Sequence, residues 1–153
     1  MKSKSYPDLS SRPFSLVWEG FLSLPPETVY EAWTTGFDKW FAQPGDTFMI
    51  PEVDRPFFFY NKLDWGRHPH YGRFLELQEN RLVEMTWLTG DGTQGGTEGA
   101  ETVIRLELSP KDQGTAVRFT HSGFVNERSR DGHDENWPLA FEELEKSFQQ
   151  EID

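Results

Sequence analysis

The sequence contains no cysteine among its 153 residues. Disulfide bonds, thiolate metal sites, a cysteine nucleophile and thiol redox chemistry are therefore excluded. A chain without cysteine suits a reducing compartment, so we expect the protein to be cytoplasmic. No stretch approaches the ~18 consecutive apolar residues of a membrane span, and residues 1–12 are polar, without the apolar core of a signal peptide. The pattern predicts a soluble protein with no membrane partner.

Positive charge is scarce as well. The chain has 15 basic residues against 26 acidic ones, which gives a net charge of −11. Nucleic acids and anionic membranes are both bound by clustered basic side chains. We therefore expect neither as a partner, and we interpret the acidic surface as a source of solubility.

Aromatic side chains are plentiful, with 13 Phe, 6 Trp and 4 Tyr. Each one buries about 150–250 Å², so a small number of positions can supply a core. The length is most simply that of one domain, and the chain shows no internal repeat and no linker. We predict a single domain over residues 13–153, preceded by a mobile tail over residues 1–12.

Apolar side chains alternate with polar ones along much of the chain, as in residues 102–108, where Ile104 and Leu106 oppose Arg105 and Glu107. This period of two predicts half-buried strands. Short connections between them predict antiparallel pairing. The predicted strands are one from Phe14 onward and those at residues 46–50, 57–62, 71–77, 82–88, 102–108 and 115–121.

Helical spacing follows the paired prolines at residues 25–26 and predicts a short helix there, with a second short helical piece at residues 37–42. The last helix is predicted from Trp137 to Ile152, because its apolar residues recur on one face. The charged residues 126–135 before it are predicted to form a loop.

Only the last helix is long and apolar enough to cover a sheet. We therefore predict an α+β fold in which a curved antiparallel sheet of six or seven strands wraps around the C-terminal helix, with two short helices after the first strand.

The glycine-rich residues 89–100 are predicted to form a mobile loop. Residues 90–95 read GDGTQG and match the dinucleotide-binding fingerprint letter for letter. The fingerprint requires a following helix, whose N-terminus holds the pyrophosphate. A strand is predicted here instead, so we expect no nucleotide cofactor.

Two groups of residues have side chains that suit zinc or manganese. His68 and His70 stand two positions apart, and Asp131, His133 and Glu135 alternate in the predicted charged loop. Neither group has a further ligand at a recognised spacing. We interpret both groups as surface residues and predict no metal.

Five motifs stand in a fixed order along the chain: PETVYEAW at residues 26–33, GRFLEL at 72–77, NRLVEMTW at 80–87, TVIRLELSP at 102–110 and GTAVRFTHSGF at 114–124. Together they resemble the domain family named after the activator of heat-shock protein 90 ATPase, over roughly residues 15–148. The resemblance implies the helix-grip fold of the START-like (SRPBCC) superfamily.

Three features depart from the family pattern. Asn136 stands where the family often has glycine, and residues 57–70 have no recognised counterpart. The chaperone activator also carries a further N-terminal domain that this sequence does not contain. The resemblance therefore supports the fold more strongly than it supports the activity behind the family name.

His121 is the most informative titratable residue. Alternation places it with Val117 and Phe119 on the inward face, near the sheet's end, where the cavity of a grip fold opens. It would serve there as a polar anchor or an acid/base. In the structural interpretation, which we favour, it bonds to the backbone and fixes the turn at Ser122 and Gly123. No carboxylate or nucleophile is visibly paired with it.

The leading functional hypothesis is a binding module that holds a small hydrophobic or aromatic molecule between the sheet and the last helix. His121 would supply the polar contact. We assign no catalytic residue and no cofactor. The predicted ligand-binding residues are Trp18, Trp33, Met85, Trp87, Phe119, His121, Phe124, Trp137, Phe141 and Leu144.

Two alternatives stay open. The family name implies a regulator of a chaperone or another protein, which acts through a surface. START-like relatives also include cyclases and dehydratases, in which His121 would be the general acid/base. This enzymatic interpretation ranks last because the sequence shows one candidate group without a partner. The sequence leaves the oligomeric state open.

Overall fold

The structure is a computed structural model that describes residues 2–63, 66–90 and 96–152. Most of the glycine-rich motif, residues 91–95, lies outside the described residues, so the mobile loop there stays a prediction. The elements are β1 (Phe14–Leu22), α1 (Pro26–Ala32), the 3-10 helix η1 (Phe37–Lys39), β2 (Thr47–Phe48), β3 (Pro56–Leu63), β4 (Gly66–Gln78), β5 (Leu82–Thr89), β6 (Thr102–Lys111), β7 (Gly114–Phe124) and α2 (Glu127–Ile152).

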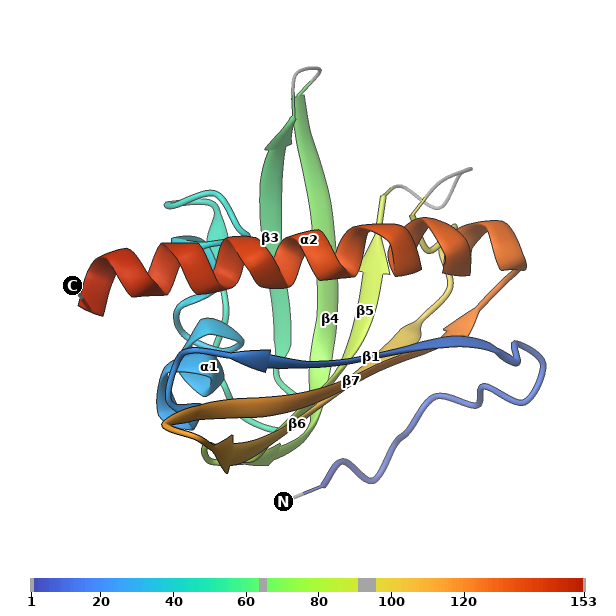
Figure 1. Cartoon of the computed structure of the whole chain (residues 1–153). Helices are drawn as coiled ribbons and strands as arrows, with labels where there is room; N and C mark the ends of the chain where they lie inside the picture. Colours follow the sequence, from blue (N-terminus) through green and yellow to red (C-terminus); the bar gives the residue numbers. More distant parts are fainter. Residues whose placement is uncertain (1, 64–65, 91–95, 153) are drawn as a thin grey trace.

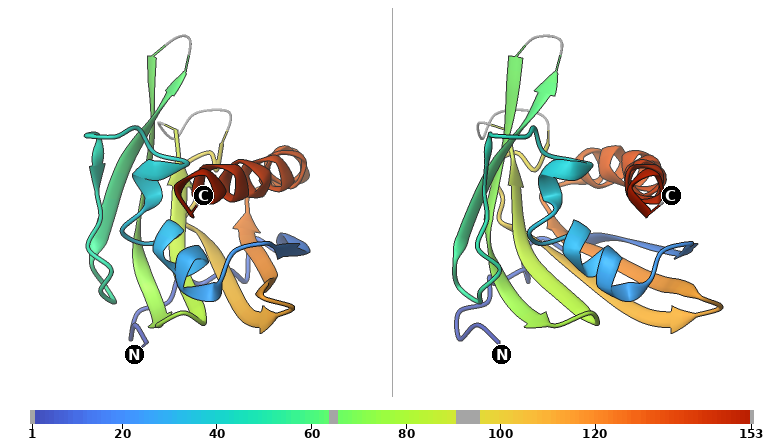
Figure 2. Two further views of the ribbon diagram at one scale, coloured as in Figure 1. Left: turned by 60° about the vertical axis from the view of Figure 1, so that its left-hand side comes forward. Right: turned by 90° about the vertical axis from the view of Figure 1, so that its left-hand side faces the viewer.

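The strands form one seven-stranded sheet in the order β1-β7-β6-β5-β4-β3-β2, with antiparallel neighbours throughout. The sheet is curved, and α1, η1 and α2 lie on its concave side (Figures 1 and 2). This arrangement confirms the predicted α+β helix-grip fold, with the long C-terminal helix and the two short helices after the first strand. None of the described helices is both long and apolar enough to cross a membrane.

Alternation along the strands makes the concave face apolar. In β6, Ile104 and Leu106 are buried while the residues between them are partly exposed, and in β7 Phe119 and His121 are both fully buried. Side chains of successive strand residues point to opposite faces, so one face meets the helices and the other meets solvent. The exception is β5, which is buried on nearly every residue. Its outer face must therefore be covered too.

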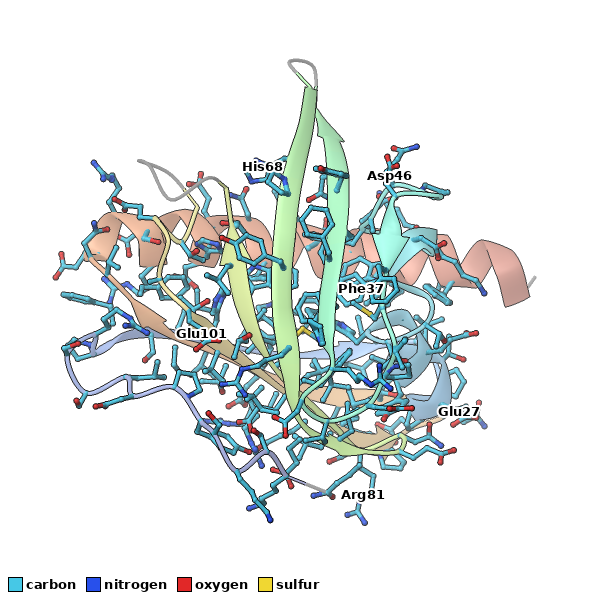
Figure 3. All side chains as sticks on the ribbon, turned by 180° about the vertical axis from the view of Figure 1, so that it is seen from behind. Glu27, Phe37, Asp46, His68, Arg81 and Glu101 are labelled. Atoms are coloured by element: carbon cyan, nitrogen blue, oxygen red, sulfur yellow. The ribbon has the colours of Figure 1, made fainter. Side chains whose placement is uncertain are left out.

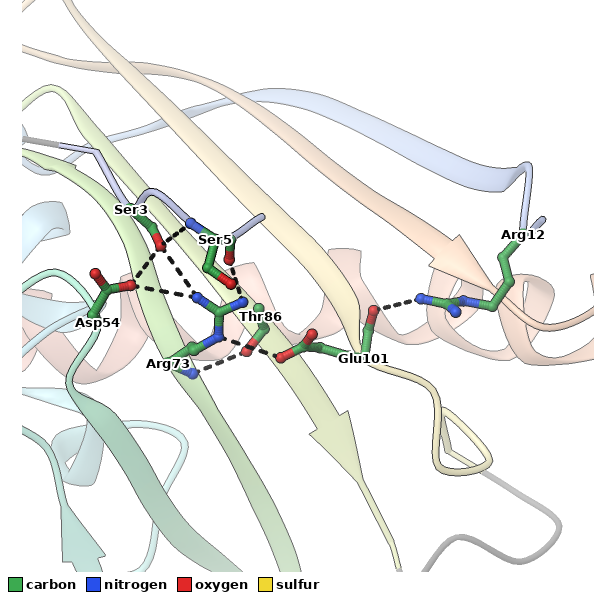
Figure 4. Close-up of polar contacts among 7 residues, drawn as sticks. All are labelled: Ser3, Ser5, Arg12, Asp54, Arg73, Thr86 and Glu101. Atoms are coloured by element: carbon green, nitrogen blue, oxygen red, sulfur yellow. Dashed lines mark hydrogen bonds and ion pairs between the residues drawn. The ribbon is translucent and has the colours of Figure 1, made fainter. Parts of the chain in front are cut away.

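The start of the chain contributes to that cover, since the Tyr6 side chain hydrogen-bonds to Glu84 of β5 and further bonds join the segment to β4. The backbone N–H of Ser3 donates to the carbonyl of Leu75 at 2.6 Å. The Arg73 guanidinium donates to the Ser5 carbonyl (Figure 4). Arg12 donates to two backbone carbonyls further along the chain, each at 2.8 Å. Seen from behind, the first residues cross the outer face of the sheet (Figure 3). These are residues for which the sequence predicts a mobile tail. Their mobility in solution stays a prediction.

The last helix begins earlier than predicted, at Glu127. The prediction of a loop over residues 126–135 is wrong because Asn126 caps the helix: its Oδ1 accepts the backbone N–H of Ser129 at 2.8 Å. Pro138, the second residue of the predicted helix, lies well inside the observed one. The charged residues of this stretch therefore belong to the helix surface.

Strand boundaries also shift on the other side of the sheet. β2 covers two residues of the predicted 46–50, whereas β4 starts at Gly66 rather than at residue 71. The interpretation of the early histidines as surface residues is wrong for His70, which is 5% exposed. It pairs with Phe59 of β3 and shares the inward face with it.

Gly132 tests the revised start of α2. A Cβ at this position would meet nothing within 4 Å. Glycine inside a helix costs roughly 0.5–1 kcal/mol relative to alanine, because its backbone loses more conformational freedom. We expect Gly132→Ala to raise the free energy of unfolding by about that amount, measured by urea denaturation followed by circular dichroism. No gain would contradict a helix that includes residues 127–135.

Candidate functional site

The residues predicted to bind a ligand meet on the concave side of the sheet. Trp33, Met85, Trp87, Phe119, Phe124, Trp137, Phe141 and Leu144 belong to one buried hydrophobic cluster, Trp18 packs against it and His121 is buried among them. The structure therefore brings all ten together. Trp87 and Trp137 also line a cavity at the edge of this cluster.

Aromatic rings fill much of the space between the sheet and the helices. Trp18 stacks on Phe141 with centroids 4.2 Å apart and planes at 7°. The fully buried ring of Trp33 lies 5.7 Å from Phe119, 5.8 Å from Trp137 and 5.9 Å from Phe141. Such contacts make this region a packed core. Most of the predicted ligand-binding residues thus belong to the core that supports the cavity walls.

His121 lies at the centre of a chain of hydrogen bonds. The indole N–H of Trp137 donates to His121 Nδ1 at 3.1 Å, and His121 Nε2 lies 2.8 Å from Thr102 Oγ1. The Thr102 hydroxyl donates to the Trp87 carbonyl at 2.5 Å. An indole nitrogen only donates and a carbonyl only accepts, so the proton of His121 sits on Nε2. The chain fixes one tautomer of a neutral imidazole.

This geometry corrects the sequence interpretation of His121. The residue points inward as predicted, but it is fully buried rather than at an open mouth. Its partners are the side chains of Trp137 and Thr102, not the backbone of the following turn. Burial also holds the pKa of His121 well below its usual range, with nearby His133 acting in the same direction. Both ring nitrogens are engaged in hydrogen bonds inside the core.

Two adjoining cavities open beside this core, where the end of β5 faces α2. The inner cavity has a volume of about 160 Å³, and its apolar lining is Phe41, Trp87, Trp137 and Ala140. The outer cavity has a volume of about 530 Å³ and a more polar lining. Four residues line both: His70, Thr89, His133 and Asn136. The two cavities therefore form one cleft with an apolar floor and a polar mouth.

Hydrogen bonds brace the rim of this cleft. Thr89 and Thr97 exchange two of them, because each backbone N–H donates to the hydroxyl oxygen of the other residue, at 3.1 and 2.9 Å. The Ser129 hydroxyl donates to the Gly96 carbonyl at 2.6 Å, and Arg128 pairs with Glu98 at 3.3 Å. The rim thus ties the end of β5 to the first turns of α2.

His70 contacts two of the aromatic residues at the floor of the cleft, Phe41 and Trp87. Its ring stacks on Phe59, with centroids 4.9 Å apart and planes at 4°, and contacts Trp87 at 5.2 Å. Burial is the main cause that lowers the pKa of His70 to about 3; the charges of His68 and His133 act in the same direction, whereas a contact with the His68 backbone acts against them. The ring is therefore neutral near pH 7. Its buried Nδ1 has no hydrogen-bond partner.

His133 faces the cleft from α2. Its Nδ1 lies 2.8 Å from the Ser129 carbonyl, which only accepts, so Nδ1 carries the proton. Burial lowers the pKa of His133 as well, against the effect of that hydrogen bond. The neutral ring leaves Nε2 as an acceptor. Across the described residues, no group of three or more His, Cys, Asp or Glu side chains is placed to hold a metal ion.

Sequence reasoning missed the four residues shared by the two cavities. One signal was available for His133, because Ser129, His133 and Trp137 recur every four residues and so share one helix face. The predicted loop at residues 126–135 hid that signal. For His70, the sequence did not reveal that β4 starts at Gly66. Its place within that strand, on the inward face, was therefore not predicted.

Comparisons with known proteins agree with this architecture. The profile of the family described as Activator of Hsp90 ATPase homolog 1-like protein matches residues 23–149. Protein MLL2253 from Mesorhizobium loti is 26% identical, with a TM-score of 0.73 over 90% of this chain and 98% of that protein. Protein CV1439 from Chromobacterium violaceum is 18% identical, with a TM-score of 0.74 over 86% of this chain and 94% of that one.

CalU16 from Micromonospora echinospora is also 18% identical, with a TM-score of 0.66 over 90% of this chain and 78% of that protein. Among curated proteins none matches the chain. The family match and the similar structures establish the START-like (SRPBCC) fold.

Two buried tryptophans test the hydrogen-bond chain. Trp137 donates to His121, whereas Trp33 Nε1 has no partner. Phenylalanine at either position removes part of a packed ring, but Trp137→Phe also leaves the buried Nδ1 of His121 unpaired. We expect Trp137→Phe to lower the free energy of unfolding by about 1–3 kcal/mol more than Trp33→Phe. Equal losses in urea denaturation would show that the Trp137–His121 bond adds nothing.

Proposed function

Because this chain belongs to the family of Activator of Hsp90 ATPase homolog 1-like proteins, we propose that it binds a small apolar or aromatic molecule in the cleft between β4, β5 and α2. The observation that carries this proposal is the apolar inner cavity, walled by Phe41, Trp87 and Trp137 below a polar mouth. Sites for small molecules are concave and mostly apolar, with a few polar groups that orient the ligand.

The sequence hypothesis placed the ligand between the sheet and the last helix. We now propose a position at one end of that space. Trp87 and Trp137 keep their role as lining residues, and the other predicted residues hold these two in place. His121 supports the wall through its bond to Trp137. We propose binding rather than catalysis by His121, because this residue is fully buried and lines neither cavity of the cleft.

We also propose a cytoplasmic location. The support is compositional: a chain without cysteine needs no oxidising compartment, and a net charge of −11 disfavours attachment to anionic lipid surfaces.

Ala140 and Leu139 provide a matched test of the binding site. Ala140 lines the inner cavity, whereas the neighbouring Leu139 is 59% exposed. Ala140→Phe should fill the cavity, and Leu139→Phe should leave it open. A set of uncharged one-ring and two-ring aromatic compounds, screened by ligand-observed NMR, should include binders with a Kd of about 1 mM or tighter.

We expect Ala140→Phe to weaken these binders at least about tenfold, a loss of about 1.4 kcal/mol, and Leu139→Phe to leave them unchanged. Circular dichroism and thermal unfolding would establish that both variants fold. An absence of binders to the wild type, or equal binding to Ala140→Phe, would overturn the proposal.

Regulation of a chaperone is the alternative that the family description suggests. A groove on the outer face of the sheet favours it: Phe58 and Tyr71 are exposed there beside Leu88, in a hollow of about 760 Å³. In this case the protein should raise the ATPase rate of Hsp90. Phe58→Ser combined with Tyr71→Ser should abolish that effect, and Ala140→Phe should not. An unchanged ATPase rate with wild-type protein would remove this alternative.

A further inference from the structure

His133 presents a hydrogen-bond acceptor that no described residue uses. Its Nδ1 carries the proton and lies 2.8 Å from the Ser129 carbonyl, one helical turn back. Within the described residues nothing donates to Nε2, and yet this atom is not one of the buried side-chain atoms that lack a partner. Nε2 therefore meets open space rather than protein.

The open space beside His133 is the cleft. The ring packs on Phe124, with centroids 4.9 Å apart, and meets His121 edge-on at 5.1 Å. The bond to Ser129 holds the Nδ1 edge of the ring against α2. Since His133 lines both cavities, the remaining edge borders the place where they join. The ring is thus oriented before a ligand arrives, which spares conformational entropy on binding.

Asn136 lies beside His133 at this junction. It stands three residues further along α2, on the same helix face, and it also lines both cavities. Its Nδ2 donates to the Gly132 carbonyl at 2.8 Å, and within the described residues nothing donates to its Oδ1. At the junction, α2 therefore offers a ligand two acceptor atoms and one remaining N–H.

The inner cavity limits the size and the charge of what can reach this junction. Its volume of about 160 Å³ is close to the roughly 150 Å³ of an apolar protein cavity that holds one benzene ring. The described residues that line it carry no charge at pH 7, because burial lowers the pKa values of His70 and His133. A charged group would lose its hydration there without an opposite charge to meet.

We propose that the cleft takes an uncharged aromatic ring that carries an O–H or N–H group, and that this group donates a hydrogen bond to Nε2 of His133. The inference rests on the proposed binding function and names the ligand class. The ring occupies the inner cavity, and its donor lies at the junction. A neutral imidazole protonated on Nδ1 can only accept at Nε2, so an ether oxygen at the same point would face a lone pair.

The test compares three one-ring probes by isothermal titration calorimetry at pH 7: phenol, toluene and anisole. Phenol stays un-ionised because its pKa is about 10. Toluene is similar in size to phenol but has no polar group, and anisole keeps the oxygen but can only accept. We expect phenol to bind about fivefold or more tightly than either of the others, as one net hydrogen bond allows.

His133→Phe and His68→Phe form the matched pair of variants. Both residues line the outer cavity, but only His133 lines the inner one as well. His133→Phe keeps a flat ring beside Phe124 and removes Nε2. We expect it to bring the phenol-to-toluene affinity ratio to about one, whereas His68→Phe should preserve the wild-type ratio. Circular dichroism would establish that both variants fold.

If His133→Phe does not fold, ¹⁵N NMR of the wild type replaces it. An unprotonated ring nitrogen changes its chemical shift when it accepts a hydrogen bond, so phenol should move the Nε2 resonance of His133 and toluene should not. His121 provides the internal reference, because its Nε2 is bonded to Thr102 and it lines neither cavity.

Three results would overturn this inference: anisole or toluene binding the wild type as tightly as phenol, a phenol preference that survives in His133→Phe, or an unmoved His133 Nε2 resonance while phenol is bound. The proposed function would still stand if aromatic compounds bind in a manner sensitive to Ala140→Phe. Failure of every aromatic compound in that screen would instead remove the binding function itself.

Discussion

The bond between Trp137 of α2 and His121 of β7 sets where the long helix lies on the sheet. Burial of apolar surface is non-directional and does not by itself select one orientation of polar groups. A hydrogen bond, in contrast, is directional. Breaking one inside the core leaves polar atoms unpaired, at a cost of about 1–3 kcal/mol each. Through Thr102 the chain of bonds continues to the Trp87 carbonyl, so one helix is tied to three strands.

The cleft follows from that arrangement. Trp137 and Trp87 stand at the two ends of the hydrogen-bond chain, and the same two rings form walls of the inner cavity. The early start of α2 then brings His133 and Asn136 over the opening. The packed core and the inner cavity thus share side chains. The cavity persists because the core holds the side chains of its walls in place.

The sequence pattern predicts the parts of the fold that depend on local alternation. The residues of β6 and β7 face the way their period of two requires, and the stripe on α2 from Trp137 onward covers the core as expected. The first turns of α2 were not predicted, because Gly132 and the run of charged residues indicate a loop more strongly than Asn126 indicates a helix cap. Asn126 and Ser129 were readable as a cap in hindsight, since both lie within one turn.

The candidate site was harder to predict, for a physical reason. Large aromatic residues line a solid core and a ligand cavity alike, and only the packing of distant segments decides between them. The partners of His121 come from β6 and α2, far from it in the chain. The burial of His70 likewise depends on its pairing with Phe59 across a strand boundary that propensity does not reveal.

The reciprocal bonds between Thr89 and Thr97 have a consequence for how this protein can evolve. These bonds hold Thr89 and Thr97 side by side. Gly96 is required there because a Cβ at this position would stand 2.1 Å from Thr89 Oγ1. The entropy of closing a loop changes slowly with its length. Changing the number of residues between Thr89 and Gly96 would therefore cost little free energy, so a lineage can vary the length of this stretch while its descendants keep the same rim.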